Sequence, residues 1–563
     1  MDRRGFLRLV GVAGVATGAG AFLAACNANP TQGSNGSGST TKAGGTLYQL
    51  SDTPSFHLDP AKSQSLATTS TGWIHRRLTA WDLTPGQNAK VAADLATDTG
   101  KSSDNGATWT YTLKDNLKFS DGSPITSADI KWGIERTFDP AFSQGLSYHK
   151  TLLAGGDSYA GPFSGKELDS IETPDAKTVV FHLVRPYGDW PWIASLITLA
   201  PVPKGKGTDA SYDTSAITSG PYQVSNYQKS VSVTLVRNPH WDHTTDPNRL
   251  ALPDTIITSL SQDDSVISQR LVADNGNDQF AFGASFVDPA QLAALQSKPA
   301  VKARVVTSEA GAITYLAMNC TKGPLANPAV RKAFQYAVDR SAFQVAVAGT
   351  AALAGPFATT LITPGIAGRE VYDLYPTGPN GDQAKAKQML AAAGYPNGLQ
   401  GLNLVVSTAN NGPGRAQALQ QALAKAGIQV NIQSMDDDTY QATVTANTVS
   451  YDLTYAGWQP DFPSPNGNIE PLFASAEIGN GGYNLARYSN PDVDNMIHDA
   501  QGATDPTEAG KKWAAVDKRI MQDAPIVPLI YTRNSFLHGS KVDNFEVPDF
   551  PAYPNYLKIG IAQ

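Results

Sequence analysis

The chain contains almost no cysteine. Only Cys26 and Cys320 occur among its 563 residues, so disulfide bonds cannot provide the framework of the fold. Stability must therefore come from a hydrophobic core, and hydrophobic residues make up 41% of the sequence. A chain of this length can bury such a core and has room for two or three domains.

The sequence also lacks the short motifs of common hydrolases and redox enzymes. It has no GxSxG, HExxH or CxxC pattern, and its eight histidines are dispersed. His240 and His243 form the closest pair, in a predicted turn where solvated surface histidines are a better interpretation than metal ligands. Distant residues can also build a catalytic site, so these absences weigh against an enzyme without excluding one. We predict no catalytic residue, no cofactor and no bound metal.

Long basic runs are missing as well. The formal net charge is -7, and charged residues make up 17% of the chain. A mildly acidic protein without a basic cluster is a poor match for nucleic acid, which binds basic surfaces. We therefore expect no nucleic-acid partner.

The N-terminus carries the clearest targeting signals. An uncharged apolar run follows Arg3, Arg4 and Arg8 and ends at residue 25. It is short for a membrane span of ~20 residues and rich in Gly and Ala, so residues 1–25 are predicted to be a signal peptide. Its Arg-Arg-x-Phe-Leu pattern resembles a twin-arginine export signal. The Leu-Ala-Ala-Cys sequence that ends at Cys26 resembles a bacterial lipoprotein cleavage site, which makes Cys26 the predicted lipidated first residue of the mature chain.

Residues 26–43 are predicted to form a flexible tether. Gly, Ser, Thr and Asn dominate this segment, and such a composition has too little apolar surface to fold. A lipid-anchored protein with a tether would lie on the outer face of the bacterial cytoplasmic membrane. This arrangement disfavours a soluble cytoplasmic enzyme.

The rest of the chain is predicted to be of mixed α/β type. Thr126 and Asp129 resemble a capping box, and Asn327 before Pro328 is a second helix start. A helix over residues 415–426 between two short apolar strands predicts a βαβ unit. The other expected elements are strands at 44–50, 108–113, 177–183 and 231–236, a hairpin turn at 103–106, and helices within 66–82 and at 383–393.

The segment 452–465 is predicted to be a half-buried strand that runs into a Pro-rich loop. Trp458 and Asp461 stand three residues apart where the chain leaves the strand. Ligands of open α/β sheets bind beyond the carboxyl ends of strands, so an aromatic ring and a carboxylate here suit a ligand site. A core tryptophan and a turn aspartate are the alternative interpretation.

Several strings of this sequence, in order along the chain, resemble the family 5 extracellular solute-binding proteins, the peptide, oligopeptide and nickel receptors of ABC importers. The resemblance covers the chain from about residue 44 to the C-terminus. The matching strings lie at 104–113, 117–129, 219–222, 236–241, 327–340, 393–398, 457–461, 488–494 and 524–529.

The resemblance implies a two-lobed periplasmic-binding-protein-like fold with an extra N-terminal subdomain and a hinge between the lobes. Closure of the lobes would bury a solute and present it to the permease of an ABC importer. A monomer is expected. The predicted boundaries are 44–90, 210–305 and 525–563 for lobe I, 91–209 for the extra subdomain and 306–524 for lobe II.

The resemblance also assigns roles to the segment 457–461. In peptide-binding members the aspartate of the Gly-Trp-x-x-Asp sequence pairs with the α-amino group of the peptide, and this position is Asp461 here. Trp458 would pack on the ligand. Ser464 stands where many members carry a second acidic residue, so the amine site differs from theirs.

Further ligand contacts are less well defined by the sequence. Arg415 and Arg487 are candidates for binding a peptide carboxylate, and Asn411 lies in a loop whose helix N-terminus could offer amide groups to a ligand oxygen. The alternative ligands are an oligosaccharide, which the 9 Trp and 21 Tyr residues suit, or a metal chelate. A lipid-anchored surface hydrolase or a structural surface protein is the alternative from a different class.

Overall fold

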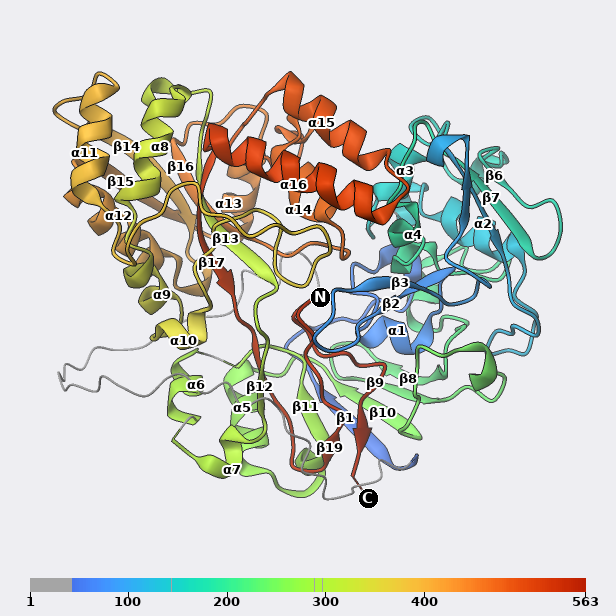
Figure 1. Cartoon of the computed structure of the whole chain (residues 1–563). Helices are drawn as coiled ribbons and strands as arrows, with labels where there is room; N and C mark the ends of the chain where they lie inside the picture. Colours follow the sequence, from blue (N-terminus) through green and yellow to red (C-terminus); the bar gives the residue numbers. More distant parts are fainter. Residues whose placement is uncertain (1–42, 143, 288, 296, 563) are drawn as a thin grey trace.

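The computed structural model describes residues 43–142, 144–287, 289–295 and 297–562. The predicted signal peptide, Cys26 and the tether up to residue 42 lie outside these residues. Two five-stranded sheets and one four-stranded sheet organise the described chain (Figure 1). The fold is of mixed α/β type, as the sequence predicts.

The first sheet contains β1 (Thr46–Leu50), β8 (Tyr222–Gln228), β9 (Ser232–Arg237), β10 (Thr255–Ser259) and β11 (Ala281–Gly283). Their order is β11-β1-β10-β9-β8. Because β1 is parallel to both β10 and β11, the carboxyl ends of these three strands meet at one edge. Such an edge is where open α/β sheets bind ligands.

The second sheet contains β13 (Ala312–Met318), β14 (Leu399–Ser407), β15 (Ile428–Met435), β16 (Leu453–Trp458) and β17 (Ile526–Thr532). Their order is β15-β14-β16-β13-β17. The helix α12 (Gly412–Lys425) connects β14 to the parallel strand β15, which confirms the predicted βαβ unit. The strand predicted in the segment 452–465 is confirmed as β16, but the prediction that it is half-buried is wrong. β16 lies between two strands, and Leu453, Thr454 and Tyr455 are all buried.

Two helices begin at the polar caps that the sequence predicts. Thr126 and Asp129 form a capping box at α2, and the Asn327 side chain accepts a hydrogen bond from the Ala329 backbone amide at α8. These helices and the others used below are α2 (Ser127–Arg136), α3 (Tyr148–Leu152), α4 (Trp190–Ile193), α8 (Pro328–Ala337), α9 (Arg340–Ala348), α11 (Gln383–Ala392), α13 (Asp437–Val444), α14 (Pro465–Phe473), α15 (Pro491–Gln501) and α16 (Pro506–Asp523).

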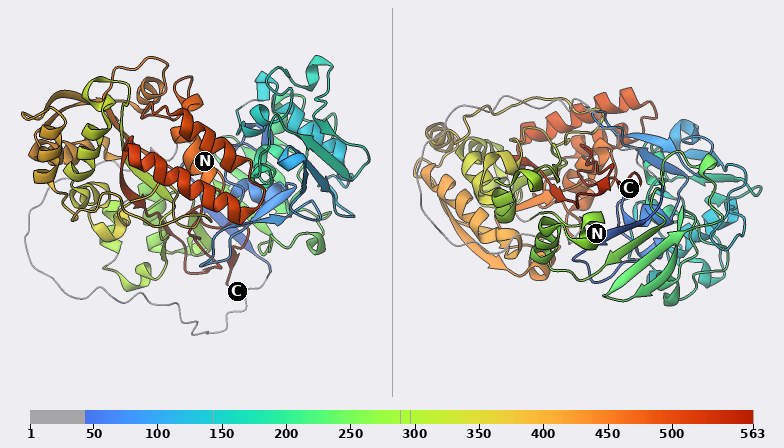
Figure 2. Two further views of the ribbon diagram at one scale, coloured as in Figure 1. Left: turned by 45° about the horizontal axis from the view of Figure 1, so that its top comes forward. Right: turned by 90° about the horizontal axis from the view of Figure 1, so that it is seen from below.

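A third sheet is formed by β4 (Lys101–Ser103), β5 (Thr108–Thr112), β6 (Ile171–Glu172) and β7 (Thr178–His182). The turn between β4 and β5 confirms the predicted hairpin, with φ angles of 56° at Asn105 and 93° at Gly106, conformations that suit these two residues. In Figure 1 and in both views of Figure 2, this sheet and the β14–α12–β15 unit lie at opposite ends of the molecule.

The chain passes between the two large sheets along a pair of neighbouring strands. β12 (Val305–Thr307) leads into β13, and β18 (Ser535–Leu537) follows β17. β12 and β18 pair antiparallel, so the two connections between the sheets lie side by side, where a hinge is expected. β17 lies in the second sheet, and the return to the first sheet therefore comes after Thr532 and not at the predicted boundary of residue 525.

The segment 66–82 differs from the expected helix. Only α1 (Ser70–Ile74) is helical, and Thr79–Asp82 forms the strand β2, which pairs with β3 (Lys90–Ala93). The residues between them do not continue the helix, because Arg76 and Arg77 are buried and form hydrogen bonds to groups far along the chain. The Arg77 guanidinium, for example, donates to the backbone carbonyls of Ser195, His75 and Ala67.

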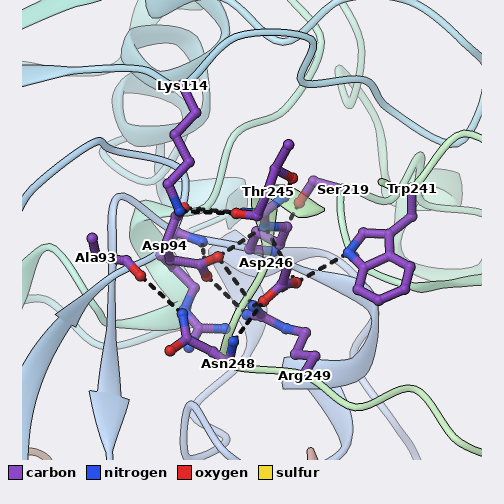
Figure 3. Close-up of polar contacts among 12 residues, drawn as sticks. Ala93, Asp94, Lys114, Ser219, Trp241, Thr245, Asp246, Asn248 and Arg249 are labelled. Atoms are coloured by element: carbon purple, nitrogen blue, oxygen red, sulfur yellow. Dashed lines mark hydrogen bonds and ion pairs between the residues drawn. The ribbon is translucent and has the colours of Figure 1, made fainter. Parts of the chain in front are cut away.

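A buried ionic network joins the segment around β3 to the segment after β9 (Figure 3). The Asp94 carboxylate accepts hydrogen bonds from Arg76 Nε at 2.8 Å and from an Arg249 terminal nitrogen at 2.9 Å. Asp246 pairs with Arg249 at 3.1 Å and accepts the indole N–H of Trp241 at 3.0 Å. All four charged side chains are almost fully buried.

The network fixes the charge state of its central carboxylate. Burial alone would raise the pKa of Asp94, but the guanidinium groups of Arg249, Arg76 and Arg77 outweigh burial and hold this pKa well below its usual range. Asp94 is therefore ionised at neutral pH. Removing it would leave buried positive charge without its partner.

We predict that Asp94→Ala lowers the free energy of unfolding by about 3 to 5 kcal/mol, because breaking a buried ion pair leaves an uncompensated charge. Urea unfolding at pH 7 measures this effect. The matched control is Asp115→Ala, which removes an exposed carboxylate paired with Lys177 and should change stability little. Equal effects of the two substitutions would contradict the central role of the network.

Candidate functional site

The loop that follows β16 lies between the two large sheets. Gln459, Pro460 and Asp461 line a cavity of about 110 Å³. Its opposite wall includes Leu260 and Ala284, which follow β10 and β11 at the edge where their carboxyl ends meet. The Pro-rich loop of the second sheet thus faces the expected ligand-binding edge of the first sheet.

Three cavities adjoin one another around this loop. A cavity of about 280 Å³ shares Gln64 with the first, and a cavity of about 520 Å³ shares Gln459 with it. Tyr483 lines both of the larger cavities. Together they surround the loop with polar and aromatic walls of the kind that bind small organic solutes.

Asp461 is held in place by a residue from a distant part of the chain. The Tyr148 hydroxyl, on α3, donates a hydrogen bond to the Asp461 carboxylate at 2.5 Å. The Tyr148 ring also packs edge-on against Phe462, with 5.3 Å between the ring centroids. Asp461 is half-buried, so its carboxylate is positioned where it can also meet a ligand cation.

Trp458 combines the two interpretations that the sequence leaves open. Its indole N–H donates to the Gly467 carbonyl at 2.7 Å, and its ring contacts that of Tyr483 at a centroid distance of 5.2 Å. The residue is buried, yet it lines the 520 Å³ cavity together with Tyr315 and Tyr440. It forms a fixed wall of that cavity.

Ser464 connects the loop to a buried carboxyl group. It caps α14, and its hydroxyl donates to the Asp189 carboxylate at 2.6 Å. Burial raises the pKa of Asp189 to about 6; the Ser464 hydrogen bond acts in the opposite direction, and Glu470 raises this pKa further. Asp189 lies 275 residues away in sequence, and no local pattern marks it or Tyr148 as part of this region.

The other three predicted ligand contacts lie elsewhere. Asn411 is exposed, and its side chain donates to the Ala346 carbonyl at 3.3 Å. Arg415 lies on α12 beside Tyr455, and burial lowers its pKa. Arg487 donates to the carbonyls of Ala446 and Asn447. None of the three lines any of the cavities around the loop, so the structure does not bring them together with Asp461.

Two further features bear on the class of protein. Within the described ranges, no group of three His, Cys, Asp or Glu side chains is placed to hold a metal ion. A search of the same residues for a helix long and apolar enough to cross a membrane finds none.

The chain matches the family model of the bacterial extracellular solute-binding proteins, family 5, over residues 90–480. It is 28% identical to the glutathione-binding protein GsiB of Escherichia coli K12, with 79% of this chain and 82% of that protein covered. Among solved structures, it resembles the clavulanic acid biosynthesis oligopeptide binding protein 2, with 31% identity, a TM-score of 0.85 and coverage of 93% and 96%. The ABC transporter-associated periplasmic binding protein DppA from Helicobacter pylori, solved in complex with the peptide STSA, shares the fold at 21% identity, a TM-score of 0.69 and coverage of 93% and 99%.

We predict that Asp189 makes stability depend on pH. Its pKa of about 6 in the folded protein exceeds the ordinary value of about 3.9, so the folded state holds the proton more tightly and stability falls as pH rises from about 4 to 6. Asp189→Asn, which can still accept from Ser464, removes this loss. The free energy of unfolding of Asp189→Asn minus that of wild type should therefore increase by about 2 to 3 kcal/mol from pH 4 to pH 7.5.

Urea unfolding of both proteins at the two pH values measures this difference. Asp157→Asn, a change at an exposed residue, serves as the control and should show the same pH dependence as wild type. If the free energies of unfolding of Asp189→Asn and wild type differ by the same amount at both pH values, the buried carboxyl group is not the source of the pH dependence.

Proposed function

Because the chain belongs to the bacterial extracellular solute-binding proteins of family 5, we propose that it captures a peptide-like solute between its lobes and delivers it to the permease of an ABC importer. The observation that carries this proposal is Asp461, which lines the 110 Å³ cavity and accepts a hydrogen bond from Tyr148, a residue that lines the 280 Å³ cavity. The curated relative GsiB is named as glutathione-binding and the 31% identical structure as oligopeptide-binding. Both names fit a solute with a free amine.

The proposed mechanism is closure of two lobes. Lobe I would comprise residues 44–90 and 210–305 and the chain after Thr532, with lobe II between them and residues 91–209 as the extra subdomain. The antiparallel pair of β12 and β18 supports this division, because only these neighbouring connections need to bend. Contacts that form only on closure then provide the binding energy. We propose that the protein acts as a monomer.

Asp461 would bind the amine of the solute. A half-buried carboxylate prefers an ammonium partner that donates charge-assisted hydrogen bonds. Trp458 would form the wall on which the solute packs. Asn411, Arg415 and Arg487 have less support, because their polar groups are exposed or bonded to other parts of lobe II.

We predict that Asp461→Ala weakens the binding of trialanine or glutathione by at least about 30-fold, since loss of one partner of a buried charge pair costs about 2 kcal/mol or more. Isothermal titration measures both affinities. N-acetyl-trialanine should bind wild type weakly and be indifferent to the substitution, and Asp157→Ala is the matched control. Unchanged affinity for the free-amine peptides would refute the role of Asp461. A thermal-shift panel with oligosaccharides and nickel chelates tests the alternative ligands.

We also propose that the chain is exported by the twin-arginine route and anchored through Cys26. In that case Cys26→Ala should shift the protein from the membrane fraction to the soluble fraction, and it should lack the lipid mass that wild type carries at its N-terminus. Fractionation with intact-mass spectrometry measures both. Cys320→Ala is the control and should remain anchored. A lipid mass on Cys26→Ala would contradict this anchor.

A further inference from the structure

Gln459 carries a buried amide group that has no hydrogen-bond partner in the described part of the chain. Neither its Nε2 nor its Oε1 atom has a hydrogen-bond partner among the described residues, and both atoms are buried. Buried side-chain amides are nearly always bonded, because a buried donor or acceptor without a partner is unfavourable. Two such atoms on one side chain point to a group that the protein itself does not supply.

The position of Gln459 shows where that group would lie. The residue lines both the cavity that contains Asp461 and the 520 Å³ cavity walled by Trp458 and Tyr440. It therefore lies between the two cavities. Its backbone is held between β16 and Pro460, whose ring fixes φ, so the amide is presented from a rigid segment.

The chemistry of the side chain restricts what it can recognise. A carboxamide offers one acceptor oxygen and one donor N–H₂ group side by side. In an extended peptide the backbone N–H and C=O of one residue point to the same side, and together they form a group that can bond with both atoms at once. A solute without such a group would leave both buried atoms unpaired, which is the condition under which binding sites discriminate strongly.

We propose that Gln459 is a specificity residue that binds the backbone N–H and C=O of one residue of the solute, between the two cavities. The inference rests on the proposed function, since it places the solute amine at Asp461. It adds that the recognised solute carries an amide next to that amine and extends into the aromatic cavity. An ester analogue lacks the N–H donor and loses one of the two hydrogen bonds.

The test compares Gln459→Met with wild type in two measurements. Methionine keeps the length of the side chain and removes both polar atoms. We expect the affinity for trialanine, measured by isothermal titration, to fall about tenfold, the equivalent of one to two neutral hydrogen bonds. The melting temperature of the solute-free protein should stay the same or rise, because the unpaired buried atoms are gone. A fall in melting temperature comparable to that of a core substitution would instead assign Gln459 a structural role.

An ester analogue tests the chemical class of the recognised group. Wild type should bind trialanine several-fold more tightly than the analogue whose first amide is replaced by an ester, and Gln459→Met should show almost no preference. Equal preferences in the two proteins would overturn the inference. If Asp461→Ala weakens binding and Gln459→Met does not, the proposed function stands and this inference fails. If wild type binds neither trialanine nor glutathione, both fail.

Discussion

The geometry of the cleft depends on a cluster of charges buried where the first sheet meets the extra subdomain. Asp94 and Asp246 lie among Arg76, Arg77 and Arg249, all almost fully removed from water. Taking charges out of water is unfavourable unless each is paired and hydrogen-bonded. The network therefore tolerates few arrangements of the segments that carry it, and it fixes the extra subdomain relative to the first sheet.

In that fixed position, the extra subdomain contacts the helices α14 and α15, which belong to the same part of the chain as the second sheet. Asn466 donates to the Tyr187 hydroxyl at 2.6 Å, and the Gly188 amide donates to the Gln501 carbonyl at 2.6 Å. A side chain at Gly188 would come within 1.9 Å of the Ala503 carbonyl oxygen, so the close approach requires glycine. The same face carries Tyr148 to Asp461. One side of the cleft is thus closed by direct polar contacts.

Local signals in the sequence predicted the elements well, and long-range contacts explain the failures. The caps at Thr126 and Asn327 and the βαβ unit depend on residues a few positions apart, and all three are confirmed. The expected helix in 66–82 is mostly absent because Arg76 and Arg77 bond to groups far along the chain. Around the candidate site, Asp461 follows from a local pattern, whereas Tyr148 is 313 residues away and no single-segment pattern could have identified it.

The structure also indicates why a loop, and not the tryptophan ring, should discriminate among solutes. Trp458 is held by Gly467 and Tyr483, so it offers a surface that cannot adapt. The loop beyond it contains Pro460 and Pro463, which restrict the backbone before any ligand arrives. Because this order is set during folding, little further entropy is lost on binding. If Asp461 and Gln459 bind the solute as we propose, its affinity depends on how well it matches the carboxylate and the amide that the loop presents.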